Sequence, residues 1–336
     1  MSTLNMDLSN YRDLLKQYIR TQDETALYQA EQFSKLSMQQ NISPEEIINV
    51  HIQALQELYP ELPEGIKSSM NFLLEAMISY GLAYQEFQSL REQQLALKSE
   101  ISVAASMQQT LLTTVKPEVE GLDIGAISIP ANQMNGDYHH FVQNDDNKLG
   151  IAIADVIGKG IPAALAMSMI KYSMDSIPEN RMDPSNILES LNRVVERNVD
   201  PSMFITMFYG LYDPSNEKFY YSSAGHEPGF YYNAAEDKFE EIEARGVVLG
   251  VTRDTEYRQY ERKVNAGDMI IMLTDGVTEC RQGDRFIEPE EVLDVIKSYM
   301  HLPAQKLVEQ VYKHFERLQD FHLRDDFTLI ILRKEV

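Results

Sequence analysis

Aspartates stand beside strand-like segments at four places between residue 137 and the end of the chain. A carboxylate at the end of a strand can face a cleft while the strand anchors its backbone, as a multidentate cation site requires. Each aspartate alone has an ordinary structural explanation, as a strand terminator or a turn cap. Four together favour a shared divalent cation, because grouped carboxylates otherwise repel one another. They are Asp137, Asp155, Asp275 and Asp325, the last followed by Asp326.

The remaining reactive side chains narrow the choice of metal and of mechanism. Cys280 is the single cysteine, and the sequence has neither a His-Glu-x-x-His nor a Cys-x-x-Cys motif, so oxygen ligation by Mg²⁺ or Mn²⁺ is favoured over Zn²⁺. No P-loop or Gly-x-Ser-x-Gly elbow occurs. We predict that Cys280 is a packed residue and that His139 and His140 form a polar surface pair. His226 lies in a predicted hairpin turn, where a structural hydrogen bond and a substrate contact both remain open.

The charge balance excludes several classes of partner. Lys and Arg number 30 and Asp and Glu 52, which gives a net charge of −22. Such a surface repels phosphate backbones and anionic lipids, so nucleic-acid binding and polybasic membrane docking are not expected. No segment approaches the roughly 20 apolar residues that cross a bilayer, and residues 1–15 lack the features of a signal peptide. The sequence therefore predicts a cytoplasmic protein.

Glycine usage divides the chain near residue 115. Residues 1–120 contain only Gly65 and Gly81, and the other glycines fall between Gly121 and Gly283. In the first part, Thr21-x-x-Glu24 and Ser43-Pro44-Glu45-Glu46 predict helix starts. An apolar stripe over residues 70–84 has the spacing of a helix that packs in a core. We therefore predict four antiparallel helices that form a four-helix bundle over residues 1–84.

The last of these helices is expected to continue as a linker over residues 85–112. Apolar residues alternate at spacings of four and three for nearly four heptads, which is the pattern of a coiled-coil seam. A long amphipathic helix that lies on its own domain is the alternative, but we favour a coiled coil between two chains. Polar seam positions at Gln94 and Gln108 would restrict its register. The seam positions are Ala83, Phe87, Leu90, Gln94, Leu97, Ile101, Ala104, Gln108 and Leu111.

Residues 113–336 alternate strands, turns and helices, which predicts an α+β domain with a layered β-sandwich and helices outside. Segments rich in Ile, Val, Phe and Tyr are predicted to be strands. Their ranges are 122–130, 149–155, 203–212, 218–223, 230–232, 268–274 and 327–332. The predicted helices open with proline. They span 162–177, 184–198, 289–301 and 303–319.

Five motifs occur in an order that resembles the SpoIIE-type branch of the metal-dependent PPM serine/threonine phosphatases. The resemblance runs from about residue 104 to residue 336. The helical part is similar to the N-terminal part of sigma-B regulators of that branch in bacilli. The motifs are Gly136-Asp137, Ala154-Asp155-Val156-x-Gly158-x-Gly160, Ala224-Gly225-His226-x-Pro228, Thr274-Asp275-Gly276-Val277-Thr278-Glu279 and Asp325-Asp326-x-Thr328.

The resemblance implies a PPM-type β-sandwich, flanked by helices, that holds two Mn²⁺ or Mg²⁺ ions between its sheets. It makes Asp155 the ligand that bridges both ions, with the backbone carbonyl of Val156 as a further ligand. Asp137, Asp275 and Asp325 match other carboxylate ligands, although the alignment leaves a choice between Asp325 and Asp326. Asp155 and Asp275 would then serve catalysis through water that the ions activate.

The resemblance also implies partners. The substrate would be a phosphorylated, RsbV-like anti-anti-sigma protein, whose dephosphorylation activates sigma-B in the general stress response. An RsbT-like switch kinase would activate the enzyme by binding the N-terminal bundle. Two chains would form a homodimer through the bundle and the linker. The signal would reach the metal site through the helix after Gly160 and the turn at residues 155–158.

Two other functions compete with a phosphatase. A catalytically inactive dimeric scaffold would have the same bundle and linker and would bind the same partners without turnover. A metal-dependent nuclease also uses grouped aspartates, but a net charge of −22 without a basic strip argues against it. Because all four carboxylate positions are present, we favour catalysis.

Overall fold

The computed structural model describes residues 8–39, 42–158, 160–178, 182–200, 203–283 and 285–335. The chain divides into two compact units, residues 1–98 and residues 99–336. The division falls inside one long helix, close to the middle of the predicted linker.

The N-terminal unit is built from helices, as the sequence predicts. The prediction that the stripe over residues 70–84 packs in its core is wrong for this single chain, because Leu73, Tyr80 and Tyr84 are exposed. The first helix, α1, packs against both α2 and α3. Tyr11 of α1 contacts the rings of Phe33 and His51, and its hydroxyl lies 2.9 Å from His51 Nδ1. The predicted capping residue Thr21 instead ends α1, while Asp23 Oδ1 accepts a hydrogen bond from the amide of Thr25. The helices are α1 (Leu8–Thr21), α2 (Glu24–Gln39), α3 (Pro44–Leu58) and α4 (Glu64–Leu112).

Helix α4 is 49 residues long and contains the whole predicted linker. Phe87, Leu90, Leu97 and Leu111 are each more than half exposed, so most of the predicted seam lies open on the single chain. Gln108 differs, because it is only 4% exposed and contacts its own C-terminal unit. The prediction that Gln108 is a polar position of a seam between two chains is therefore wrong for this structure, because its side chain is bonded within its own chain. No helix within the described ranges has the length and apolarity to span a bilayer.

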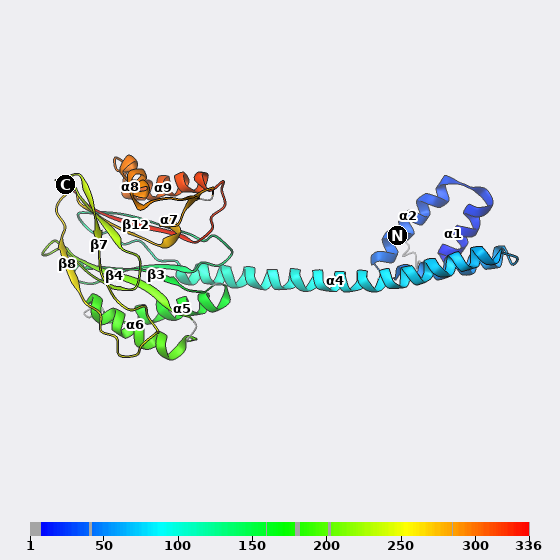
Figure 1. Ribbon diagram of the computed structural model, residues 1–336, viewed down its shortest axis with the longest axis horizontal. Coiled ribbons are helices and arrows are strands. Elements are labelled where there is room, and N and C mark those ends of the chain that lie inside the picture. The colour runs from blue at the N-terminus through cyan, green and yellow to red at the C-terminus, as the bar shows by residue number, and fades with distance from the viewer. Residues whose placement is uncertain are drawn as a thin grey trace. The chain divides into compact units, whose positions relative to one another are not determined.

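The C-terminal unit contains two five-stranded antiparallel sheets (Figure 1). The first has the order β1-β12-β9-β6-β7 and the second the order β2-β3-β4-β5-β8. The first sheet comprises β1 (Leu122–Ile129), β12 (Phe327–Lys334), β9 (Met269–Leu273), β6 (Gly229–Asn233) and β7 (Lys238–Ile242). The second comprises β2 (Asp137–Gln143), β3 (Leu149–Val156), β4 (Ile205–Asp213), β5 (Lys218–Ala224) and β8 (Tyr260–Lys263).

Helices cover the outer faces of both sheets, which gives four layers (Figure 1). Three buried clusters fill the spaces between them: one between the sheets, and one between each sheet and its helices. A strand buried on both faces must be apolar throughout, and β3 reads Leu-Gly-Ile-Ala-Ile-Ala before its aspartate. The predicted α+β sandwich is confirmed. Helices α5 (Ile161–Asp175) and α6 (Pro184–Asn198) cover the second sheet, and α8 (Pro289–Tyr299) and α9 (Ala304–Leu318) the first.

Five strands within the described residues escaped the sequence analysis: the two-residue strands β10 (Arg281–Gln282) and β11 (Arg285–Phe286), and three strands that lie at the edges of the large sheets. Strands β2 and β8 are the two edges of the second sheet, and β7 is an edge of the first. Edge strands commonly carry charged residues that discourage pairing with another chain, and such residues hide the strand pattern of β7 and β8. The short helix α7 (Asp275–Thr278) completes the unit.

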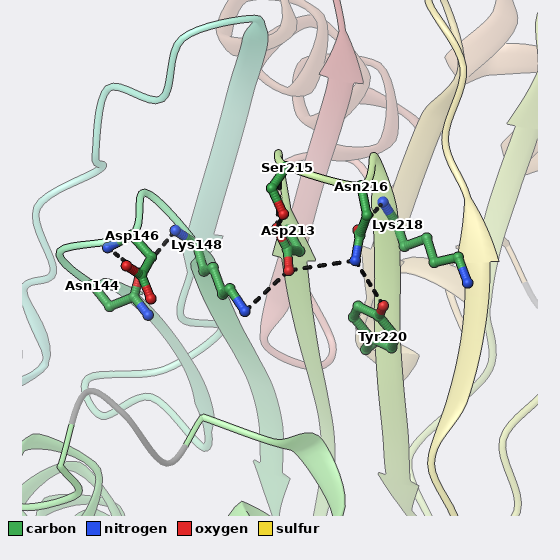
Figure 2. A network of polar contacts seen from close by, with 8 residues as sticks. All are labelled: Asn144, Asp146, Lys148, Asp213, Ser215, Asn216, Lys218 and Tyr220. Carbon is green, nitrogen blue, oxygen red and sulfur yellow. Dashed lines mark hydrogen bonds and ion pairs between the residues drawn. The ribbon is translucent and has the colours of Figure 1, made fainter.

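A polar network joins the β2–β3 and β4–β5 turns of the second sheet (Figure 2). Asn144 Oδ1 accepts hydrogen bonds from the amides of Asp146 and Lys148. The ammonium of Lys148 lies 3.0 Å from Asp213 Oδ2, and Asp213 Oδ1 also accepts bonds from the amide and hydroxyl of Ser215. The network therefore fixes the register at this end of the sheet.

Replacing Lys148 with methionine should lower the free energy of unfolding by about 1–2 kcal/mol, because the buried Asp213 carboxylate loses its cation. Urea unfolding of the full chain measures the change. Lys238→Met, at an exposed position of β7, is the control and should change the stability by less than about 0.5 kcal/mol. Equal stabilities of the two variants would contradict the assignment.

Candidate active site

One pocket of about 730 Å³ collects aspartates from both sheets. Asp155 stands near the end of β3 in the second sheet. Asp275 opens α7, separated by one residue from the end of β9, and Asp325 and Asp326 directly precede β12, so these three are positioned by strands of the first sheet. The topology thus brings together residues that lie far apart in the sequence. The lining residues are Ile101, Asn132, Gln133, Met134, Gly136, Asp155, Val156, Ile157, Gly158, Gly160, Asp275, Asp325 and Asp326.

The pocket concentrates negative charge in a partly buried space. Burial, followed by repulsion from Asp275, Asp325 and Asp326, raises the pKa of Asp155 to about 7. Burial and then Asp325, Glu227 and Glu279 raise the pKa of Asp275 to about 6. Carboxylates held this closely favour an environment that supplies positive charge.

The backbone around Gly136 shows that the pocket suits a hard cation. A Cβ placed on Gly136 would lie 3.1 Å from Asp326 Oδ2, 3.5 Å from Asp155 Oδ1 and 3.8 Å from the carbonyl oxygen of Val156. Three oxygens thus surround the space beside the Gly136 Cα that the methyl group of an alanine would fill. An all-oxygen donor set fits Mg²⁺ or Mn²⁺.

The aspartates alone do not form a complete metal centre. Within the part of the chain that the structure describes, no group of three or more His, Cys, Asp or Glu side chains meets the geometry of an ion site. Ligation in this pocket would therefore use backbone carbonyl and water oxygens besides carboxylates. Mg²⁺ sites in proteins usually have this composition.

Asp137 lies beside Asp155 but does not line this pocket. It begins β2, pairs in register with Asp155 of β3, and is only 2% exposed. Its Oδ2 accepts hydrogen bonds of 2.7 and 2.6 Å from the hydroxyls of Thr274 and Thr328. Burial raises the pKa of Asp137 well above its usual value, although both hydroxyls oppose the shift. The structure therefore brings Asp155, Asp275 and Asp325 together in the pocket with Val156, and uses Asp137 to join the two sheets.

Asp325 and Asp326 have different surroundings. Asp326 Oδ1 accepts a hydrogen bond of 2.7 Å from the amide of Ala131, and its Oδ2 accepts one from the amide of Gly136. Asp325 is exposed, and its Oδ1 accepts a bond of 2.9 Å from the amide of Asp326. Asp326 thus holds the 131–136 loop, a role that the sequence analysis missed. The Asp-Asp-x-Thr motif marks the residue but not these partners.

His226 has a structural position. It is 8% exposed, and its Nε2 lies 3.1 Å from the carbonyl oxygen of Leu273. A carbonyl only accepts, so Nε2 donates and Nδ1 accepts the hydroxyl of Thr206 at 2.9 Å. Of the two roles left open for this residue, the structure supports the hydrogen-bonding one.

Lowering the pH should destabilise the protein through His226. Burial lowers the pKa of His226 to about 4, whereas the unfolded side chain titrates near 6.5. Between these pH values the unfolded state binds more protons than the folded state. The contribution of neutral His226 to the free energy of unfolding is therefore fully present above pH 6.5 and is lost as the pH falls towards 4. At pH 5 the loss is about 2 kcal/mol. Urea unfolding at pH 7.5 and pH 5 should show a fall for the wild type that exceeds the fall for His226→Gln by that amount, and equal falls would contradict it.

Two other predictions about reactive side chains have different outcomes. Cys280 is buried, and burial raises the pKa of its thiol to about 12, so it is the packed residue that we expected. The prediction that His139 and His140 form a surface pair is wrong. His140 is 8% exposed, and its Nε2 lies 3.3 Å from Asp175 Oδ1. The strand β2 turns this residue towards α5.

Comparison with known proteins agrees with this architecture. The family model of Stage II sporulation protein E (SpoIIE) matches residues 145–335, and that of the N-terminal domain of the phosphoserine phosphatase RsbU matches residues 9–83. The phosphoserine phosphatase RsbU of Bacillus subtilis is 55% identical over 326 residues, which cover 97% of each chain. This coverage includes both units.

Solved structures share the fold at low sequence identity. The SiaA-PP2C domain of Pseudomonas aeruginosa aligns with a TM-score of 0.62 at 17% identity, over 72% of this chain and 98% of that domain. The RsbU and RsbW domains of Rv1364c from Mycobacterium tuberculosis align with a TM-score of 0.57 at 24% identity, over 67% of this chain and 62% of theirs. With the family matches and the full-length relative, these findings show that the chain belongs to the SpoIIE family of PPM phosphatases, as a phosphoserine phosphatase of the RsbU type.

Proposed function

We propose that this phosphatase uses two Mn²⁺ or Mg²⁺ ions to hydrolyse the phosphoserine of an RsbV-like anti-anti-sigma protein. The convergence of Asp155, Asp275, Asp325 and the Val156 backbone in one pocket carries the proposal. These four residues would hold the metal, with Asp155 as a ligand of both ions and with Asp155 and Asp275 as the catalytic carboxylates. Asp137, the fifth predicted ligand, supports them from the hydrogen-bonded position described above.

The chain contributes position and charge to this reaction. When bound, the cations supply the Lewis acidity that activates water and neutralises the phosphate. Asp155 and Asp275 would hold the cations, on backbone anchored by the buried strands β3 and β9. The partly buried walls strengthen these electrostatic interactions relative to bulk water. Water can attack the phosphorus directly, which agrees with the lack of a nucleophile motif in the sequence.

Regulation is assigned to the N-terminal part. We propose that residues 1–84 and the 85–112 linker form a homodimer and that an RsbT-like kinase activates the enzyme by binding residues 1–84. The match of the RsbU N-terminal domain over residues 9–83 supports this division, with residues 113–336 as the phosphatase domain. The exposed side chains of Phe87, Leu90 and Leu97 support a partner for the linker. Activation of sigma-B in the cytoplasm would follow.

The proposal is tested by phosphate release from a phosphoserine RsbV-like protein. The full-length enzyme, Mn²⁺ and an RsbT-like kinase are combined, and the kinase or the metal is then left out in turn. We expect release that requires Mn²⁺ and rises with the kinase. No release in the complete mixture would refute the substrate and favour a scaffold that binds these partners without turnover.

A further inference from the structure

Gln108 is the buried glutamine of an otherwise open helix segment. It is 4% exposed, whereas its neighbours Met107 and Gln109 are exposed. Its Nε2 donates a hydrogen bond of 2.7 Å to the carbonyl oxygen of Asn135, and its Oε1 accepts one of 3.0 Å from the amide of Asn135. One side chain thus holds both backbone polar groups of a single residue, which fixes that residue in position and orientation.

The side chain of Asn135 is hydrogen-bonded to both sheets. Its side-chain Nδ2 donates to the hydroxyl of Ser128 at 2.9 Å, and its Oδ1 accepts the amide of Asp137 at 2.9 Å. The contacted residues belong to β1 of the first sheet and β2 of the second. Asn135 is therefore fixed between the two sheets and the end of α4.

The next residue, Gly136, touches the aspartate pocket directly. Its amide donates to Asp326 Oδ2, and its carbonyl oxygen accepts the amide of Val156 at 3.1 Å. The oxygens of Asp326, Asp155 and Val156 surround the position of its missing Cβ. A shift of Asn135 would consequently move both a carboxylate and the backbone of a proposed ligand.

We propose that Gln108 is a positioning residue of the phosphatase, through which α4 holds Asn135 and Gly136, and with them Asp326 and Val156, in the arrangement that receives metal. The inference rests on the proposed metal site and adds the route by which the linker reaches it. Successive helix residues are about 100° apart, so a modest rotation of α4 removes Gln108 from Asn135. This route differs from the one expected from the sequence, which ran through the helix after Gly160.

The test compares Gln108→Met with Gln109→Met in the full-length protein. Methionine keeps the length of the side chain but cannot bond the Asn135 backbone, and Gln109 is the exposed neighbour. In metal-free protein, hydrogen exchange of peptides that cover residues 131–137 should be about tenfold faster in Gln108→Met and unchanged in Gln109→Met. Gln108→Glu keeps the acceptor for the Asn135 amide and should show a smaller increase.

A kinetic measurement separates positioning from a general structural role. In Gln108→Met, the Mn²⁺ concentration for half-maximal phosphate release should rise about tenfold, while kcat at saturating Mn²⁺ changes less than about threefold. Unchanged exchange in residues 131–137 would overturn the inference, as would an increase spread evenly over the C-terminal unit. The exchange measurement needs no substrate, so it stands even if the wild type releases no phosphate, a result that would refute the proposed function alone.

Discussion

Replacing Asp155 with asparagine should reduce phosphate release at saturating Mn²⁺ by about a thousandfold, because it removes the carboxylate at the centre of the pocket. Asp155 reaches the pocket from the second sheet, opposite Asp275 and Asp325 beside the first. A cation held between the sheets therefore loses its carboxylate ligand from the second sheet and keeps only the Val156 carbonyl there. Initial rates with a phosphoserine RsbV-like substrate and the activating kinase measure the effect.

Urea unfolding of Asp155→Asn shows whether this variant is still folded. In metal-free protein, Asp155→Asn relieves the repulsion among buried carboxylates, so its urea midpoint should equal or exceed that of the wild type. Asp294→Asn, which removes a charge from an exposed position of α8, is the matched control and should keep full activity. Wild-type rates in Asp155→Asn would refute the site, whereas a folded and inactive protein supports it.

Sequence patterns predicted the elements where one local signal dominates. Proline at the first helical turn marked α3, α6 and α8, and unbroken apolar runs marked β3, β9 and β12. The edge strands β7 and β8 were missed because their charged residues suit a solvent-exposed edge rather than an apolar pattern. Strand β2 was missed because it begins with Asp-Tyr-His-His, which lacks an apolar run although most of the strand is buried. Their pairing is determined by the sheet beside them, which lies far away in the sequence.

The candidate site also contains residues that the sequence predicted and residues whose roles only the structure shows. Strand ends predicted that Asp155, Asp275 and Asp325 would face a cleft, and the structure places them in one pocket. The roles of Asp137, Asp326 and Gln108 depend instead on bonds to threonines and to backbone amides that are brought close only by the fold. A sequence pattern shows which residues are polar, but it does not show which distant amide each one meets.

Gly136→Ala should lower phosphate release by about a hundredfold or more and should remove most of the stabilisation by Mn²⁺. The alanine methyl would occupy the space among Asp326, Asp155 and the Val156 carbonyl, at 3.1 to 3.8 Å from their oxygens. It takes the space where the proposed site offers oxygens to a cation. A wild-type chain at 100 times its Mn²⁺ dissociation constant gains about 2.7 kcal/mol in stability.

Thermal unfolding with and without Mn²⁺, together with initial rates, checks this result. Gly65→Ala is the control, because a Cβ at Gly65 meets nothing within 4 Å, and this variant should keep both its activity and its response to Mn²⁺. A Gly136→Ala protein that Mn²⁺ stabilises as strongly as the wild type would place the ions elsewhere. Loss of the Mn²⁺ response without loss of metal-free stability would instead locate the ions beside Gly136, where the linker contact through Asn135 ends.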